Sequence, residues 1–176
     1  MAYSEVTAGN SENGTINVII EIRKGERNKY EFDKETGRLF LDRVNGTYLG
    51  YPADYGYVPG TLCEDGDPLD ALLIIDESVP HGTVVPSRAI GVLYFEDDGE
   101  MDEKLIVVPV DDISKDHIHE LDDLGEAFKK NVEHFYTHYK DWKKDWKGVE
   151  GTLHGWGDAT AAMQVIREAI ARVSTT

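Results

Sequence analysis

The hydrophobic pattern changes its period once along the chain, and this change predicts a strand-rich body followed by helices. Up to about residue 109, apolar residues alternate or form short runs, as at 16–22, where the even-numbered apolar residues share one face. From residue 121 to residue 139, apolar residues instead recur every three or four positions, which is the period of an amphipathic helix. Asp158 is a good N-cap residue, so a second helix is expected from there to about Val173.

The strand-like part contains several short segments with little helix between them. These segments are 16–22, 29–32, 38–43, 69–75, 89–95 and 105–110. The turn signal at 33–37 joins two of them into a hairpin. We therefore expect the 176 residues to form one α+β, mostly β domain, a small and mostly antiparallel barrel followed by two C-terminal helices. Residues 1–15 are expected to be a loose N-terminal arm, and the glycines at 148, 151, 155 and 157 a flexible connection.

The charge balance excludes several classes of partner. Asp and Glu number 34 against 18 Lys and Arg, which gives a net charge of −16. A nucleic-acid binder would normally be basic, and an anionic membrane would repel this chain, so neither is expected as a partner. The one cysteine, Cys63, excludes an internal disulfide, and no signal peptide or spanning segment is visible. A cytoplasmic protein is the expectation.

Two acidic clusters stand directly before apolar runs, at 64–70 and 96–103. A solvated acidic loop is the ordinary interpretation of such a cluster. Here both clusters lie at the mouths of predicted strands, where a barrel keeps its ligand site. Crowded carboxylates repel one another unless protons or cations neutralise them, and hard oxygen ligands suit Mg²⁺ or Mn²⁺. The first cluster does not have the spacing of an EF-hand loop, because its glycine is second rather than sixth.

Scarce cations and phenols complement these carboxylates. Lys29 and Glu31 are two residues apart and share a strand face, and Asp102 and Lys104 repeat this arrangement. Arg43 ends a predicted strand. Further candidates are Tyr139 and Lys140 at the end of the first helix, and the phenols of Tyr51, Tyr55 and Tyr57 on one side of an extended segment. Carboxylates interleaved with Lys, Arg and Tyr suit a metal–polyphosphate complex, since the metals bind carboxylates and the phosphate oxygens take the donors.

These residues, taken together, resemble the soluble family I inorganic pyrophosphatases. The most specific element is the sequence Asp65-Gly66-Asp67-Pro68-Leu69-Asp70, which is similar to the family's D-G-D-P-x-D signature. The resemblance runs from about Val18 to Asp141. The supporting pieces occur in the family's order and are Lys29-Tyr30-Glu31, Asp42-Arg43, Tyr51-Pro-x-x-Tyr55-Gly-Tyr57, Asp97 with Asp102-x-Lys104, and His134-Phe-Tyr-Thr-His138-Tyr139-Lys140-Asp141.

The resemblance implies a fold, a reaction and a set of roles. The fold would be a distorted five-stranded OB-like β-barrel flanked by helices, and the reaction would be hydrolysis of the magnesium complex of pyrophosphate. Several Mg²⁺ ions per site are implied, with Mn²⁺ or Zn²⁺ as substitutes. Asp65, Asp70, Asp97 and Asp102 would be metal ligands, and Glu21 and Glu31 outer-shell carboxylates. Asp67 would be the general base, and the phosphate-side residues would be Lys29, Arg43, Tyr55, Lys104, Tyr139 and Lys140.

The resemblance also implies a homohexamer, in which His134, His138 and Asp141 would lie at a subunit interface. A metal site formed by the two histidines is the weaker alternative, because no third ligand is evident nearby. The segment after Asp141 is a few residues longer than in the family, so the sequence leaves open whether Lys144 or Lys147 contacts phosphate.

Two other functions are open alternatives. A two-metal nuclease would also use clustered carboxylates, but it would need a basic track along a polymer, and the cations here are scattered. A non-catalytic OB-type metal-binding module would leave Asp67 and the tyrosine–lysine set without a role.

Overall fold

The computed structural model describes residues 5–144, 146 and 151–175. The strands are β1 (Gly9–Asn10), β2 (Thr15–Ile22), β3 (Asn28–Phe32), β4 (Leu39–Val44), β5 (Asp54–Tyr57), β6 (Asp70–Leu73), β7 (Val84–Asp97), β8 (Glu100–Met101), β9 (Lys104–Pro109) and β10 (Gly151–Gly157). The α-helices are α1 (Glu126–His138) and α2 (Ala159–Val173). Short 3₁₀ turns are η1 (Ser11–Asn13), η2 (Ile113–Lys115), η3 (Leu121–Leu124) and η4 (Asp141–Lys144).

Five strands pair in a ring, in the order β2, β5, β6, β9, β7, and the pairing of β7 with β2 completes it. β6 and β9 are parallel, and the other pairs of the ring are antiparallel. β7 pairs with both β2 and β9, and its ladder with β9 shifts register between Ala89 and Gly91. The predicted mostly antiparallel five-stranded architecture is confirmed.

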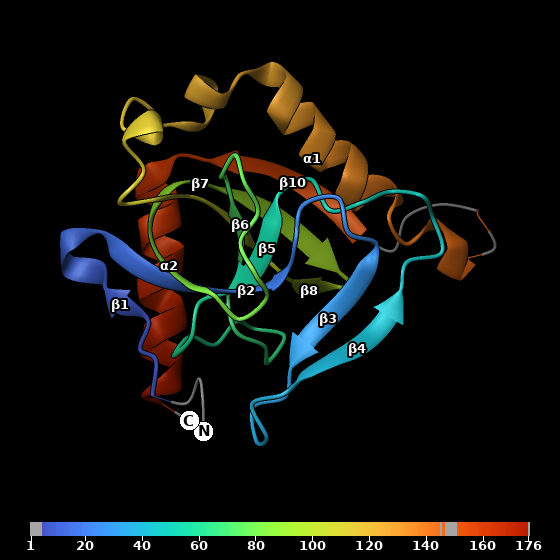
Figure 1. Ribbon diagram of the computed structural model, residues 1–176, viewed down its shortest axis with the longest axis horizontal. Coiled ribbons are helices and arrows are strands. Elements are labelled where there is room, and N and C mark those ends of the chain that lie inside the picture. Colours follow the sequence, from blue (N-terminus) through green and yellow to red (C-terminus); the bar gives the residue numbers. More distant parts are fainter. Residues whose placement is uncertain (1–4, 145, 147–150, 176) are drawn as a thin grey trace.

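The two helices cover different parts of this ring (Figure 1). α2 packs along β7, and its residues Ala162, Val165, Ile166 and Ala169 join a core that includes the buried side chains of β2. α1 packs against β10 and covers a second, aromatic-rich core. The second helix begins as predicted, because the Asp158 side chain accepts a hydrogen bond from the Ala161 amide at 2.8 Å. Neither helix combines the length and the apolar character that crossing a membrane requires, within the residues described.

The first predicted helix is divided in two. Residues 121–124 form the 3₁₀ turn η3, and the α-helix begins only at Glu126, after Gly125 with φ of 81°. A positive φ interrupts a right-handed helix, and glycine adopts it without strain. The turn lets Leu121 pack directly on Gly91, where an added Cβ would lie 2.4 Å from Leu121 Cγ.

The predicted hairpin is confirmed and forms a sheet of its own. β3 and β4 pair antiparallel, with Lys29 opposite Arg43. Their turn is closed by the Gly37 amide, which donates to the Asp33 carbonyl at 2.8 Å. This hairpin lies beside the ring and projects away from α2 (Figure 1).

Two expectations about connecting segments are wrong. Part of the expected loose arm, at Gly9–Asn10, is strand β1 and pairs with the start of β2. The glycine-rich segment at 151–157 is not a flexible connection, because it forms β10 and pairs with β7. In β10, long-range ladder hydrogen bonds outweigh a composition typical of loops, whereas β1 pairs with a strand that begins only a few residues later in the sequence.

Candidate active site

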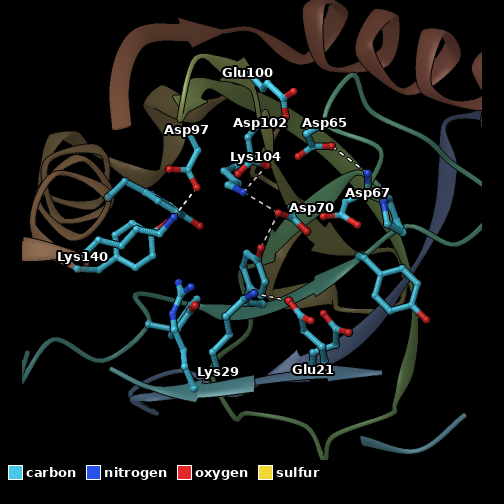
Figure 2. Close-up of a pocket in the computed structure, with 18 of the residues that line it drawn as sticks. Glu21, Lys29, Asp65, Asp67, Asp70, Asp97, Glu100, Asp102, Lys104 and Lys140 are labelled. Carbon is cyan, nitrogen blue, oxygen red and sulfur yellow. Dashed lines mark hydrogen bonds and ion pairs between the residues drawn. The ribbon is translucent and has the colours of Figure 1, made fainter. Parts of the chain in front are cut away.

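A cavity of about 380 Å³ opens where several strands of the ring end or begin. β5 ends at Tyr57, β6 begins at Asp70 and β9 begins at Lys104, and the ladder places these residues side by side. Among the described residues, nine carboxylates and five Lys or Arg side chains line the cavity. Figure 2 shows that the labelled acidic and basic side chains converge on a common space.

The loop before β6 carries two of the carboxylates. Thr61 fixes its base, because its hydroxyl donates to the Val58 carbonyl at 2.5 Å and accepts from the Leu69 amide at 2.9 Å. At the tip, Gly66 has φ of 89°, a conformation that side chains disfavour. The resulting tight turn places Asp65 and Asp67 at the cavity, and the Asp67 amide donates to Asp65 Oδ1 at 2.9 Å.

Lys104 lies at the centre of the carboxylates and is 3% exposed. Its ammonium donates to Asp70 Oδ2 and to Asp102 Oδ1, each at 2.6 Å. The Tyr55 hydroxyl donates to the same Asp70 oxygen at 2.5 Å. Burial alone would lower the pKa of Lys104, but the two carboxylates outweigh burial and hold that pKa well above its ordinary value. The ammonium is therefore a permanent positive charge in this site.

The end of α1 supplies a second group of donors. Tyr139 caps the helix, and the next residue, Lys140, donates to Asp97 Oδ2 at the end of β7. Burial raises the pKa of the Tyr139 phenol well above its ordinary value, so the phenol keeps its proton as a donor. The other carboxylate oxygen of Asp97 is buried and has no hydrogen-bond partner among the described residues.

The β3–β4 hairpin supplies the third group. Lys29 donates to Glu31 on its own strand and to Asp42 Oδ2 at 3.1 Å on β4. The guanidinium of Arg43, opposite Lys29 in the ladder, lies 5.9 Å from the centre of the Tyr139 ring. The hairpin and the end of α1 thus bring Arg43, Tyr139 and Lys140 to one side of the cavity.

Burial and mutual repulsion raise the pKa of two of the cavity carboxylates, Asp70 and Glu21. Burial, together with the nearby Asp102, raises the pKa of Asp70 to about 6. Burial, with Asp70 and Glu31 adding to it, raises the pKa of Glu21 to about 8. Additional positive charge in the cavity would stabilise the ionised form of these groups.

The donor set fits hard divalent cations. In the part of the chain that the structure describes, no three His, Cys, Asp or Glu side chains are already arranged as a metal-ligand set, and Lys104 and Lys140 form ion pairs with Asp70, Asp102 and Asp97. The site nevertheless offers only oxygen ligands, including the buried and partnerless Oδ1 of Asp97. Such oxygen-only ligands favour Mg²⁺ or Mn²⁺ over softer metals.

The structure brings together every predicted metal, base and phosphate residue in this one cavity. They are Glu21, Lys29, Glu31, Arg43, Tyr55, Asp65, Asp67, Asp70, Asp97, Asp102, Lys104, Tyr139 and Lys140. Their individual roles stay predictions. The side chain of Lys144 and the whole of Lys147 lie outside the described residues, as does any contact of theirs with the site.

Sequence reasoning missed several residues of the cavity wall. Asp98 and Glu100 line it, and the acidic run around them was the available signal. Tyr136 also lines it, three positions before Tyr139 and thus on the same side of the helix. An aromatic residue on an amphipathic helix is ordinarily a core residue, so the sequence carried no separate signal for it.

His134, His138 and Asp141 are not among the residues that line the cavity. His138 contacts Asp141 within the chain, since its Nδ1 lies 2.9 Å from Asp141 Oδ2. The ring of His134 lies 4.7 Å from that of His138. Their role at a subunit interface stays a prediction.

Comparison with known proteins identifies close relatives. The family model described as "Inorganic pyrophosphatase" matches residues 18–174. The chain is 50% identical over 165 residues to the inorganic pyrophosphatase of Rickettsia prowazekii, which covers 92% of this chain and 94% of the relative. It is 50% identical over 158 residues to that of Corynebacterium glutamicum, covering 90% and 98%. The crystal structure of the inorganic pyrophosphatase from Thermus thermophilus superposes with a TM-score of 0.92 at 36% identity and covers 99% of both chains.

Proposed function

The chain belongs to the inorganic pyrophosphatase family, and we propose on that premise that it hydrolyses inorganic pyrophosphate to two orthophosphates with Mg²⁺ as cofactor. One observation carries the proposal. One cavity combines carboxylates that can bind metal ions with cationic and phenolic donors that can bind phosphate. These side chains come from β2, the β3–β4 hairpin, the 61–70 loop, the β7–β9 region and the end of α1. Neither a nuclease nor a binding module is favoured by these relatives.

The carboxylates are proposed to hold the cations. Asp65, Asp70, Asp97 and Asp102 would bind Mg²⁺ directly, and Glu21 and Glu31 would act through water. When bound, the cations neutralise phosphate charge and make the attacking water more acidic. Mn²⁺ or Zn²⁺ would be the substitutes.

Asp67 is proposed as the general base. Its side chain is exposed at the cavity on the turn that Gly66 allows, so it can reach a water molecule there. The Asp67 carboxylate would accept a proton from that water molecule, while the oxygen of the water forms a bond to one phosphorus atom. The bond between that phosphorus and the bridging oxygen breaks in line, and its electron pair leaves with the second phosphate.

The cationic and phenolic side chains are proposed to bind the two phosphates. Lys29, Tyr55 and Lys104 lie on the barrel and hairpin side of the cavity. Arg43, Tyr139 and Lys140 would stabilise the charge on the departing phosphate. Fixed donors in a partly buried site stabilise developing charge more strongly than water does, because they need little reorganisation.

Assembly and location complete the proposal. The protein would form a homohexamer in the cytoplasm, with His134, His138 and Asp141 at a subunit interface. The half-exposed His138, paired with Asp141 outside the cavity, supports a role for this surface other than catalysis.

The test is release of orthophosphate from pyrophosphate in Mg²⁺, with an EDTA control and with a phosphodiester as a second substrate. We expect rapid release from pyrophosphate that EDTA abolishes and that excess Mg²⁺ restores, with no cleavage of the phosphodiester. Folded, Mg²⁺-loaded protein that releases no phosphate from pyrophosphate would refute the proposal. Preferential cleavage of the phosphodiester would favour the nuclease instead.

A further inference from the structure

A tyrosine in the cavity wall has a buried hydroxyl group without a hydrogen-bond partner among the described residues. Tyr136 belongs to α1, is 2% exposed, and lines the cavity. Its hydroxyl oxygen is shielded from solvent and unbonded. A buried hydroxyl that loses water without gaining a partner is unfavourable, and phenylalanine would fill the same space without that penalty. Packing of the fold therefore does not explain why this position carries a hydroxyl.

Neighbouring rings fix the direction of the Tyr136 side chain. Its ring centre lies 5.2 Å from that of Phe95 on β7, and 5.1 Å from that of Phe135 in an edge-on contact. Tyr139 approaches at 5.5 Å, also edge-on. With three aromatic neighbours and only 2% of its surface exposed, Tyr136 cannot turn its hydroxyl to solvent without displacing part of the core.

The ammonium of Lys104 lies 5.7 Å from the centre of the Tyr136 ring. Tyr55 and Phe95 face the same ammonium, with ring centres at 5.8 and 5.9 Å. Lys104 thus occupies an aromatic cage, a geometry that favours a cation over the ring faces. Burial raises the pKa of Tyr136 well above its ordinary value, so its hydroxyl keeps its proton and stays neutral beside the lysine.

The hydrogen bonds of Lys104 leave a donor for such a group. An ammonium has three N–H donors, and those of Lys104 that have partners here go to Asp70 and Asp102. Under the proposed function these two carboxylates are metal ligands, so Lys104 needs other acceptors when it binds phosphate. The Tyr136 hydroxyl oxygen is a buried acceptor with no hydrogen-bond partner among the described residues, Lys104 included, and the centre of its ring lies 5.7 Å from the ammonium.

We propose that Tyr136 is a positioning residue for Lys104 in pyrophosphate hydrolysis, which rests on the proposed function. Its ring forms one wall of the cage around Lys104. When metals occupy Asp70 and Asp102, the ammonium would shift toward the Tyr136 hydroxyl oxygen, which would then accept one of its N–H groups while the remaining donors face a phosphate. Tyr136 acts through the lysine and does not itself contact the reacting atoms. Removal of the hydroxyl is therefore expected to weaken substrate binding without weakening the fold.

The test compares Tyr136→Phe with a matched control, Tyr94→Phe. Tyr94 is a partly buried tyrosine of β7 that packs on the other core, and it is not among the residues that line the cavity. We expect Tyr136→Phe to keep or raise the melting temperature, to raise the KM for pyrophosphate about ten-fold and to leave kcat within about two-fold. Tyr94→Phe should change neither kinetic constant. An unchanged KM, or a lowered melting temperature with a lowered kcat at constant KM, would overturn the proposal.

A double-variant cycle tests whether the effect passes through Lys104. In a Lys104→Arg background, Tyr136→Phe should change KM much less than in the natural chain, because the two residues act as one unit. Equal effects in both backgrounds would refute the coupling. If the double variant does not fold, calorimetry in Mg²⁺ measures the affinity of Tyr136→Phe for inorganic phosphate. A lower affinity than that of the natural chain supports the proposal, and an equal affinity refutes it.

This binding measurement also separates the two proposals. A natural chain that hydrolyses no pyrophosphate would refute the proposed function, whereas phosphate affinity would still report on Tyr136. If the natural chain is active and Tyr136→Phe has the same KM and the same phosphate affinity, only the positioning role of Tyr136 is refuted.

Discussion

At the scale of single residues, most residues of the candidate site could be predicted from the sequence, because clustered charged residues are easy to recognise in it. The run from Asp65 to Asp70 combines carboxylates with a glycine and a proline, and the structure places its three aspartates at the cavity. Tyr136 was not predictable in the same way. An aromatic residue at helical spacing is ordinarily a core residue, and only the three-dimensional packing shows that its hydroxyl lacks a partner.

Gly66→Ala tests the role of the turn at residue scale. An added Cβ would meet no atom within 4 Å, but φ of 89° strains any side chain by about 1–2 kcal/mol. Because relief of that strain would move Asp65 and Asp67, we expect kcat to fall at least about ten-fold. Gly14→Ala is the matched control, since Gly14 also has a positive φ and open space but lies far along the chain from the loop. Equal activities of the two variants, measured by phosphate release, would contradict this role.

At the scale of elements, local patterns predicted which segments are strands and helices, whereas long-range contacts decided how they end and pair. The period of α1 is visible in the sequence, yet its start depends on the positive φ of Gly125. β10 could not be predicted from its glycine-rich composition, because its stability comes from the ladder with β7. The same holds for the pairing of β2 with β7, which joins strands far apart in sequence and completes the ring.

Gly46→Ala tests the contact that joins the hairpin to the end of α1. A Cβ at Gly46, just after β4, would lie 2.5 Å from Cγ of Trp142, just after Lys140. One of the two segments must move, and they carry Arg43 and Lys140. We expect a loss of about 1–3 kcal/mol in unfolding free energy and a raised KM for pyrophosphate. Trp142→Leu should partly rescue Gly46→Ala in urea unfolding and in kinetics; the absence of any rescue would exclude this steric cause.

At the scale of the whole molecule, the net charge of −16 argues against nucleic acid and anionic membranes as partners. Composition does not reveal assembly, because a subunit interface depends on shape as well as on charge. The His134–His138 pair beside Asp141 is the feature on which the proposed hexamer can be tested.

Acidification from pH 8 to pH 5 is expected to loosen the proposed hexamer. Histidine side chains as a class gain positive charge over this range, and two charged rings only 4.7 Å apart would repel each other. Sedimentation velocity should show a shift to smaller species at pH 5 that His134→Gln reduces. A single unchanged species at both pH values would contradict the role of these residues.

The most direct test of the central claim is the rate of phosphate release by Asp67→Asn in Mg²⁺. Asparagine has the same shape but cannot accept the proton, and Asp116→Asn makes the same change at an exposed position that does not line the cavity. We predict that Asp67→Asn unfolds at the temperature of the natural chain but releases phosphate about 10²–10⁴ times more slowly, while Asp116→Asn keeps full activity. A rate for Asp67→Asn within about two-fold of the natural chain would contradict base catalysis by Asp67, the centre of this account.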